Sequence, residues 1–474
     1  MHEIRDERRL RERRPAPAAA AAAESLAGFS NSADECVRVL RAKIEARTAR
    51  VGVIGVGAVG LPLCECLLEA GFSVLAFDSD EHALAELRSG ESTLAHFESS
   101  RVRTMLATRR FVPSAEHDKL AELDIALICV PTPLDARRAP DLSHVRAVGA
   151  ALAEHAPAGR LVVLESTSYP GTTREVLGAI FRAAGARPGE DVFLAYSPER
   201  EDPGRPNTST RTIPKLVGGT CERSSELAQA FYRTAIECVH LVSRAEVAEA
   251  AKLFENVFRS VNIALVNELK LIAHEQGLDP WEVLDAAATK PFGFLPFAPG
   301  PGMGGHCIPK DPHYYAWAAE AAGVRSRFVA LADETNRAMP AYVCERTRAA
   351  LFERSVELAG ARVLLLGLAY KAEVGIVAES PALALAELFH ARAARVSFSD
   401  PHVASVPQSS RACFESARSL EFDLEVLAGF DALVVCTDHQ AFDWELIART
   451  DVLVIDTRNA LALRMRGRAN YRRA

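Results

Sequence analysis

The sequence predicts an α/β protein in which two doubly wound parallel sheets are joined by a long central helix. Short apolar runs alternate with amphipathic stretches in two series, one over residues 51–200 and one starting at residue 362. Such alternation favours parallel sheets with helices on both faces. Between the series, from residue 245, apolar side chains recur at i, i+3 and i+4, which predicts the joining helix.

The predicted elements follow in order along the chain. A short amphipathic helix is expected over residues 33–48, where Val37, Leu40 and Ile44 stand at helical spacing. Residues 51–54 then form a short buried strand that enters a glycine-rich turn. The other predicted strands lie in the segments LAFDSD, DIALICVPTP, RLVVLESTS, DVFLAYSPE, RVLLLGLAYK, RVSFSDPH, DALVVCTDH and DVLVIDTRN.

Composition excludes several classes of protein. Hydrophobic residues make up 49% and charged residues 25%, an ordinary globular balance. The net charge of −7 gives no general attraction to nucleic acid, so we expect no such partner. No apolar run reaches the ~18–20 residues of a membrane span, so we expect no membrane partner and a cytoplasmic location. The ten cysteines lack a small-scaffold spacing and should mostly be reduced and buried.

The glycine-rich turn at residues 55–60, GVGAVG, is typical of Rossmann-like dinucleotide binding. Gly55 permits the tight turn, Gly57 lets the backbone approach a pyrophosphate, and Gly60 lets helix pack on strand. Asp78 ends the next strand, where a carboxylate binds ribose hydroxyls and repels a 2′-phosphate, which favours NAD over NADP. The alternative is a chance glycine turn. We expect the cofactor to contact Gly55, Gly57, Ala58, Val59, Gly60, Asp78, Thr132 and Ser166.

A second glycine-rich loop, PGPGMGGHCIPKD at residues 299–311, holds Cys307 and Asp311 four residues apart. Its glycines allow close backbone approach to a ligand. A thiolate can add to an aldehyde, the thiohemiacetal can lose hydride to give a thioester, and water can hydrolyse that thioester. One site can thus take an alcohol to an acid. A lone cysteine is otherwise a small buried hydrophobe, which is our interpretation of the other nine.

Polar residues at strand ends and on the long helix are further candidates. Lys252 and Asn256 share one helix face, and Arg259 lies one turn further on. A lysine and an amide can stabilise an alkoxide. The alternative is that the two residues simply belong to a solvent-exposed helix face, as an isolated Lys/Asn pair usually does. Thr167 and Glu199 end strands, at the sheet edge that faces ligands in doubly wound folds, or are simple turn and cap residues.

The ordered motifs of the chain, over residues 36–465, resemble the UDP-glucose/GDP-mannose dehydrogenase family. The matching segments are GVGAVGLPL, CVPTPL, STSYPGTT, AYSPERE, EAAKLFENVFR, PGPGMGGHCIPKDP, LGLAYK, ESPAL, SDPH and DTRN. The resemblance implies two successive oxidations of the C6 alcohol of a nucleotide sugar, each with one NAD and no metal.

The resemblance also implies roles for single residues. Cys307 is the nucleophile, Lys252 and Asn256 support the oxyanion, and Glu199 is the general acid/base of hydrolysis. Asp311 and Thr167 handle protons and water. The expected substrate contacts are Glu199, Arg200, Lys252, Asn256, Arg259, Lys290, Gly302, Gly304, Lys371 and Arg458, with Lys290 directed to a neighbouring subunit.

The substrate expected from the motifs is a UDP-N-acetylhexosamine. SPERED, RTIPKLVGG, AATKPFGF and GGHCIP resemble the branch of UDP-N-acetylglucosamine 6-dehydrogenases. GGHCIPKDP keeps a lysine seen in the UDP-glucose branch, so a UDP-glucose 6-dehydrogenase is the alternative. A catalytically weak, nucleotide-sugar-binding regulatory protein is a second alternative.

Three departures from the family pattern bear on cofactor binding. Ala58 replaces an aromatic residue in the first glycine turn. Ala378 stands where the family has an arginine that touches the dinucleotide, and Ile376 replaces an acidic residue before it. We expect a lower cofactor affinity, or another residue in the arginine's place, and a lost ion pair.

Four parts follow from these patterns. Residues 1–32 are expected to be a disordered tail, 33–245 an NAD-binding Rossmann domain with its leading helix, 246–345 a central helical dimerisation domain, and 346–474 a C-terminal UDP-sugar-binding Rossmann-like domain. The long helix carries more apolar positions than one thin domain can cover, which predicts a homodimer or a larger oligomer. These positions are Leu253, Val257, Val261, Leu265, Leu269 and Ile272.

Overall fold

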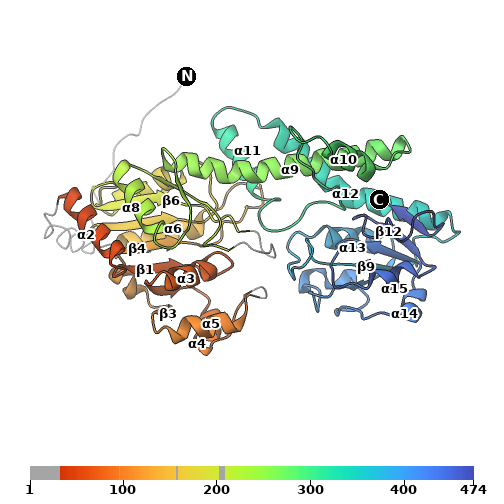
Figure 1. The fold of residues 1–474 in the computed structure, drawn as a ribbon, viewed down its shortest axis with the longest axis horizontal. Coiled ribbons are helices and arrows are strands. Elements are labelled where there is room, and N and C mark those ends of the chain that lie inside the picture. Colours follow the sequence, from red (N-terminus) through yellow and green to blue (C-terminus); the bar gives the residue numbers. More distant parts are fainter. Residues whose placement is uncertain (1–31, 95–96, 156–157, 202–208) are drawn as a thin grey trace, which may run out of the picture.

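A computed structural model describes residues 32–94, 97–155, 158–201 and 209–474. All but the last residue of the predicted tail, 1–32, lie outside these ranges. Two α/β halves lie side by side beneath a long helix that crosses above both of them (Figure 1). The prediction of two Rossmann-like halves joined by a central helix is therefore confirmed.

The N-terminal half is built on an eight-stranded sheet in the order β3-β2-β1-β4-β5-β6-β7-β8. Neighbouring strands run parallel except that β7 is antiparallel to β6. The sequence did not identify β3, β7 or β8. The strands are β1 (Arg50–Ile54), β2 (Ser73–Phe77), β3 (Phe111–Ser114), β4 (Ile125–Ile128), β5 (Arg160–Leu164), β6 (Val192–Tyr196), β7 (Lys215–Gly219) and β8 (Val239–Leu241).

Helices cover both faces of this sheet because its central strands are apolar on both sides. One face packs against α2, α3 and α8, and the other packs against α6 and α7. The helices are α2 (Ala33–Glu45), α3 (Gly60–Glu69), α4 (Glu81–Ser89), α5 (Ser99–Ala107), α6 (Ser143–Glu154), α7 (Gly178–Ala183) and α8 (Glu222–Tyr232), with short turns η1 (His117–Glu122) and η2 (Thr172–Leu177).

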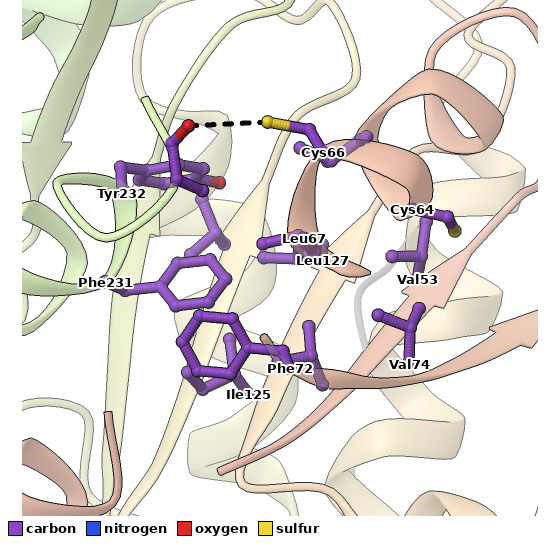
Figure 2. Packing of buried hydrophobic residues seen from close by; sticks show 14 of the residues in the cluster. Val53, Cys64, Cys66, Leu67, Phe72, Val74, Ile125, Leu127, Phe231 and Tyr232 are labelled. Carbon is purple, nitrogen blue, oxygen red and sulfur yellow. Dashed lines mark hydrogen bonds between the residues drawn. The ribbon is translucent and has the colours of Figure 1, made fainter. Parts of the chain in front are cut away.

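Aromatic rings fill the core on the α3 and α8 face (Figure 2). The rings of Phe72 and Phe231 are 5.5 Å apart, tilted by 60°. The Sγ of Cys66 donates a hydrogen bond to the carbonyl of Ala235 at 3.5 Å. The predicted leading helix is present as α2, whose Leu40 and Ile44 are buried against this core.

The long central helix is α9 (Ala245–Glu275), and α12 (Arg327–Phe352) packs along it before leading into the C-terminal half (Figure 1). Two shorter helices complete this region, α10 (Pro280–Ala288) and α11 (Asp311–Ala321). In the ranges that the structure describes, no helix is both long and apolar enough to cross a lipid bilayer.

The C-terminal half contains a five-stranded parallel sheet in the order β10-β9-β11-β12-β13. Helices α12 and α13 cover one face, and α14 and α15 cover the other. The sequence did not identify the edge strand β13. The elements are β9 (Arg362–Leu366), β10 (Arg395–Ser399), β11 (Ala432–Val435), β12 (Leu453–Asp456), β13 (Tyr471–Arg473), α13 (Pro381–Ala391), α14 (Leu424–Ala428), α15 (Trp444–Ala448) and the turn η3 (Gln408–Cys413).

Candidate active site

The glycine turn after β1 has the geometry that a dinucleotide requires. Gly55 has φ +95°, and a Cβ there would lie 2.7 Å from the carbonyl oxygen of Cys129. A Cβ on Gly60 would lie 1.9 Å from the carbonyl oxygen of Gly55, so helix and strand meet too closely for a side chain. Gly57 has open space at this position, which suits the approach of a pyrophosphate.

The other predicted cofactor contacts surround this turn. Asp78, at the end of β2, accepts the backbone N–H of Val56 at 2.9 Å and thus faces the glycine turn. The Ser166 hydroxyl donates to the carbonyl of Val130 at 2.7 Å and holds the turn after β4. The carbonyl of Thr132 accepts the Tyr314 hydroxyl at 2.9 Å, which ties this turn to α11. Two further predicted contacts, Ala58 and Val59, are exposed and half-buried, respectively.

The Cys307 loop is held by the C-terminal half. The N–H of Gly305 donates to the carbonyl of Ala378 at 2.9 Å, and a Cβ on Gly304 would lie 2.6 Å from the carbonyl of Glu379. Gly302 has φ +139°. These glycines are therefore required by close backbone contact between the two segments. Ala378, which stands where the family has an arginine, therefore contributes its main-chain carbonyl to the cysteine loop.

A buried polar group under the same loop was not found from the sequence. Asn267 accepts the N–H of Gly300 at 3.0 Å and donates to Asn336, while Lys270 donates to the carbonyl of Gly300 at 2.8 Å. Burial, and then Arg458, lower the pKa of Lys270 to about 7. Asn267 and Lys270 lie at i and i+3 on a buried helix face. Polar residues at positions that face the core were the sequence signal that could have revealed this group.

The structure brings the predicted catalytic residues of α9 and the cysteine loop together. Asn256 donates to the Asp311 carboxylate at 2.6 Å, and both side chains are buried. Cys307 is exposed as a residue, but burial of its Sγ among neighbouring atoms, and then Asp311, raise the pKa of the thiol. Lys252 and Arg259 act in the opposite direction and stabilise the thiolate.

All ten cysteines are free, as predicted. Five of the other nine are buried, but Cys238 is exposed, so the expectation of burial is wrong at that position. Cys238 precedes the short edge strand β8, where few elements cover it.

Asp311 makes the stability of this site dependent on pH. Burial raises its pKa to about 6, although Lys252 and the hydrogen bond from Asn256 oppose the shift. An unfolded aspartate titrates near about 3.9, so between these values the folded state binds more protons. The free energy of unfolding therefore falls as the pH rises through this window.

We expect Asp311→Asn to gain stability relative to the parent protein as the pH rises. The gain should reach about 2–3 kcal/mol between pH 4 and pH 8, because the amide cannot ionise. Denaturant unfolding at both pH values measures it, with the exposed Asp285→Asn as control. A difference between variant and parent that stays constant with pH would contradict the assignment.

Glu199 lies at the end of β6, and its carboxylate is fixed by the main chain. Its Oε1 accepts the backbone N–H groups of Arg200 and Glu201 at 2.6 and 2.5 Å. Lys215, which the sequence did not single out, lies with its Nζ 3.9 Å from Oε2 of Glu199. Thr167 is half-buried after β5, the strand beside β6. Among the described residues, no hydrogen bond or ion pair joins Glu199 to the cysteine loop.

The remaining predicted substrate contacts occupy different positions. Arg200 pairs with Glu255 at 2.7 Å and donates to the carbonyl of Pro214 at 2.7 Å. Arg458 lies against the cysteine loop, since a Cβ on Gly300 would meet its guanidinium at 2.7 Å. Lys371 is half-buried after β9. Lys290 is exposed in the segment after α10, with its Nζ 5.0 Å from the ring centroid of Phe292.

Glu373, His402 and His439 place potential metal-binding atoms within 4.8 Å of one another. The Nδ1 of His439 accepts the backbone N–H of Glu373 at 3.1 Å, and its Nε2 lies 3.2 Å from the Asp400 carboxylate. Because both ring nitrogens already have partners, this group fits a hydrogen-bonded support for the segment after β9 better than a metal site.

Three domain profiles of one family match the chain. They describe the NAD-binding domain at residues 49–236, the central domain at 246–338 and the UDP-binding domain at 364–463 of the UDP-glucose/GDP-mannose dehydrogenase family. The chain belongs to this family. It is an NAD-dependent UDP-sugar dehydrogenase, and the profile of the NAD-binding domain covers the glycine turn and Asp78.

Individual members of the family are similar over most of the chain. A UDP-N-acetyl-D-mannosamine dehydrogenase of Pyrococcus horikoshii is 32% identical and spans 87% of this chain and 96% of its own. A UDP-N-acetyl-D-glucosamine 6-dehydrogenase of Pseudomonas aeruginosa is 36% identical over 68% of this chain and 75% of its own. The solved UDP-D-ManNAc dehydrogenase structure from P. horikoshii superposes with a TM-score of 0.78 at 31% identity, covering 87% and 96% of the two chains.

We expect the dehydrogenase to prefer NAD to NADP through the charge of Asp78. Like-charge repulsion of a 2′-phosphate is worth about 1–3 kcal/mol, or about 5–150-fold in kcat/KM. Asp78→Asn keeps an acceptor for the N–H of Val56 and removes the charge. It should therefore reduce the difference in kcat/KM between NAD and NADP, as should Asp78→Ala. Equal kcat/KM for the two cofactors in the parent enzyme would refute this role.

Proposed function

We propose that this dehydrogenase oxidises the C6 alcohol of a UDP-N-acetylhexosamine, in the first place UDP-N-acetylglucosamine, to the uronate. The proposal is supported by the exposed Cys307, which sits beside the Asn256–Asp311 pair. A cysteine with basic neighbours in a ligand-facing loop suits covalent capture of an aldehyde, which a simple alcohol dehydrogenase does not need.

The reaction has two oxidations and one hydrolysis. Bound NAD supplies the hydride acceptor of each oxidation. The alcohol gives its proton to the Asp311 carboxylate while Lys252 and Asn256 stabilise the oxyanion, and loss of the first hydride leaves the aldehyde. The Cys307 thiolate then adds to the aldehyde carbon to form a thiohemiacetal. Loss of a second hydride from that carbon gives a thioester. Glu199 then takes a proton from the water that attacks the thioester, and the Cys307 thiolate leaves.

Asp311 and Thr167 complete this scheme. Because the pKa of Asp311 is raised to about 6, the Asp311 carboxyl can exchange a proton near neutral pH, next to the amide that holds the oxyanion. Thr167 adds a hydroxyl at the end of β5, from which it can orient a water.

The acetamido group of the substrate is assigned to Arg200. Of the described residues, Glu255 and Pro214 accept three of the five guanidinium N–H groups, which leaves two that can donate to a substrate carbonyl. A substrate without the acetamide leaves such a donor unpaired, at a cost of about 1–3 kcal/mol or about 5–150-fold in rate.

The C2 epimer, UDP-N-acetylmannosamine, is the second candidate because the P. horikoshii relative, which carries that name, matches most of the chain. NADH formation should be measured with both epimers, UDP-N-acetylgalactosamine and UDP-glucose. The highest kcat/KM is expected for UDP-N-acetylglucosamine. A preference for the mannosamine sugar would replace the first candidate by the second, and a preference for UDP-glucose would overturn both.

Arg200→Ala measures the part that this residue plays in the choice of substrate. It should reduce the preference over UDP-glucose and leave binding of NAD unchanged. An unaltered preference would remove the role of Arg200 and leave the substrate assignment in place.

We further propose that the enzyme is a homodimer formed by the central helices. Leu265 and Ile272 are 60% and 49% exposed on α9, and Phe328 is 74% exposed on α12, whereas Leu253 and Val257 pack within the chain. Large exposed apolar side chains on adjoining helices mark an interface. Light scattering should show a dimer that Leu265→Asp dissociates. Leu463→Asp, at an 88% exposed position on the C-terminal half, is the control.

A further inference from the structure

A buried ion pair behind Glu199 has no part in the reaction scheme. The Nζ of Lys215 on β7 lies 2.7 Å from Oε2 of Glu165, the residue that follows β5, and both side chains are almost completely buried. The hydroxyl of Tyr232 donates to the other oxygen of Glu165. Tyr232 itself belongs to the apolar core and stands at its edge in Figure 2. Removal of two charges from water is costly, so such a pair calls for an explanation.

Lys215 reaches the candidate acid/base in two ways. Its Nζ donates to the carbonyl of Pro198 at 3.3 Å, directly before Glu199, and lies 3.9 Å from Oε2 of Glu199 itself. The main chain holds Oε1 of Glu199. One carboxylate oxygen is therefore fixed by backbone N–H groups, and the other faces the lysine ammonium.

Glu165 and Glu199 compete for the single ammonium of Lys215. Burial alone would lower the pKa of Lys215, but Glu165 and Glu199 together raise it, so the lysine stays charged. Burial raises the pKa of Glu165, and Lys215 counteracts this shift. Glu201 also lies near Glu199, and burial followed by Glu199 raises the pKa of Glu201.

Within the ranges that the structure describes, the other ionisable groups facing this cluster carry no unpaired positive charge. Cys129, after β4, has a pKa raised well above its usual value by burial and then by Glu165, so it stays a neutral thiol. Burial likewise raises the pKa of Tyr232. On the α9 side, the charge of Arg200 is paired with Glu255. Among the described residues, Lys215 is therefore the cation that faces Oε2 of Glu199 from inside the protein.

We propose that Lys215 is a positioning residue that orients the carboxylate of Glu199 through Oε2, and that Glu165 moderates this effect by sharing the same ammonium. The inference rests on the proposed role of Glu199 as the acid/base of thioester hydrolysis. Lys215 does not touch the substrate. It acts through the orientation and the charge of Glu199.

Two single substitutions should act in opposite directions. Lys215→Met removes the cation that faces Glu199 and leaves Glu201 to repel the charge of Glu199, so the acid limb of the kcat profile should move to higher pH by about one unit. Glu165→Gln keeps partners for Lys215 and Tyr232 but frees the ammonium for Glu199, so the limb should move to lower pH. If Lys215 and Glu165 had only structural roles, the two substitutions would not move the acid limb in opposite directions.

The double variant Glu165→Gln/Lys215→Met guards against misfolding. It leaves neither charge buried without a partner, and its acid limb should lie between those of the two single variants. Lys215→Arg keeps the positive charge, so its acid limb should lie at the same pH as that of the parent enzyme. Lys119→Met, at a surface lysine paired with Glu116, is the control that should not move it.

Infrared titration provides a readout that needs no turnover. The band of the protonated Glu199 carboxyl is identified as the one that Glu199→Gln removes. As the pH is lowered, this band should appear at a higher pH in Lys215→Met than in the parent enzyme, and at a lower pH in Glu165→Gln. The inference would be overturned if the pH at which this band appears moved in the same direction in both single variants, or if it moved in none of the single and double variants. If the parent enzyme oxidises none of the UDP-sugars, the proposed function fails, and the infrared result still decides the role of Lys215.

Discussion

Replacement of Cys307 by serine is expected to lower the rate of uronate formation by roughly 10³-fold or more. A serine hydroxyl is a far weaker nucleophile than a thiolate, and Lys252 and Arg259 cannot ionise it as they help to ionise the thiol. The aldehyde stage would then lack an acyl-enzyme. The substrate should still bind, because the loop is held by Gly305 and Gly300.

The control for this variant is Cys238→Ser. Cys238 is exposed like Cys307 but precedes β8, at the edge of the sheet. Its replacement should leave kcat unchanged, and iodoacetamide should inactivate both the parent enzyme and Cys238→Ser. Uronate formation by Cys307→Ser at the parent steady-state rate would exclude the covalent route.

Glu199→Gln should separate the oxidations from hydrolysis. The amide oxygen can still accept the N–H groups of Arg200 and Glu201, so the loop keeps its shape, but it cannot take a proton from water. We expect a burst of NADH up to two per site, followed by a steady state slower by about 10²–10⁴-fold. Mass spectrometry of the quenched enzyme should show the acyl group on the peptide that contains Cys307.

The matched control for this experiment is Glu190→Gln. Glu190 is an exposed carboxylate at the other end of β6, where it pairs with Arg187. It should show parent kinetics without a burst. Loss of the burst in Glu199→Gln would show that Glu199 acts before the thioester forms and would reassign its role to the oxidations.

Local patterns in the sequence were sufficient for the fold and for the cofactor turn. Strand and helix periodicity predicted the two sheets and α9, because burial imposes a period on every element that packs against a core. The roles of Gly55 and Gly60 also followed from the sequence alone, since tight turns and close helix–strand contact are properties of neighbouring residues.

The edge strands were missed for a related reason. β8 and β13 have three residues each and are partly exposed, so they carry little apolar signal. β7 was quoted only as part of a family motif, and its antiparallel pairing with β6 has no local signature.

Only the tertiary structure decided which polar groups lie behind the proposed catalytic residues. Lys215 and Glu165 come from different strands, and Asn267 and Asn336 come from different helices. The carbonyl of Ala378 meets the cysteine loop from the other half of the protein. These pairs arise from contacts between segments that are distant in sequence, and a single chain carries no periodic signal for them. The sequence by itself therefore determined most of the elements and predicted the reacting side chains, whereas packing decided the charges and hydrogen bonds around them.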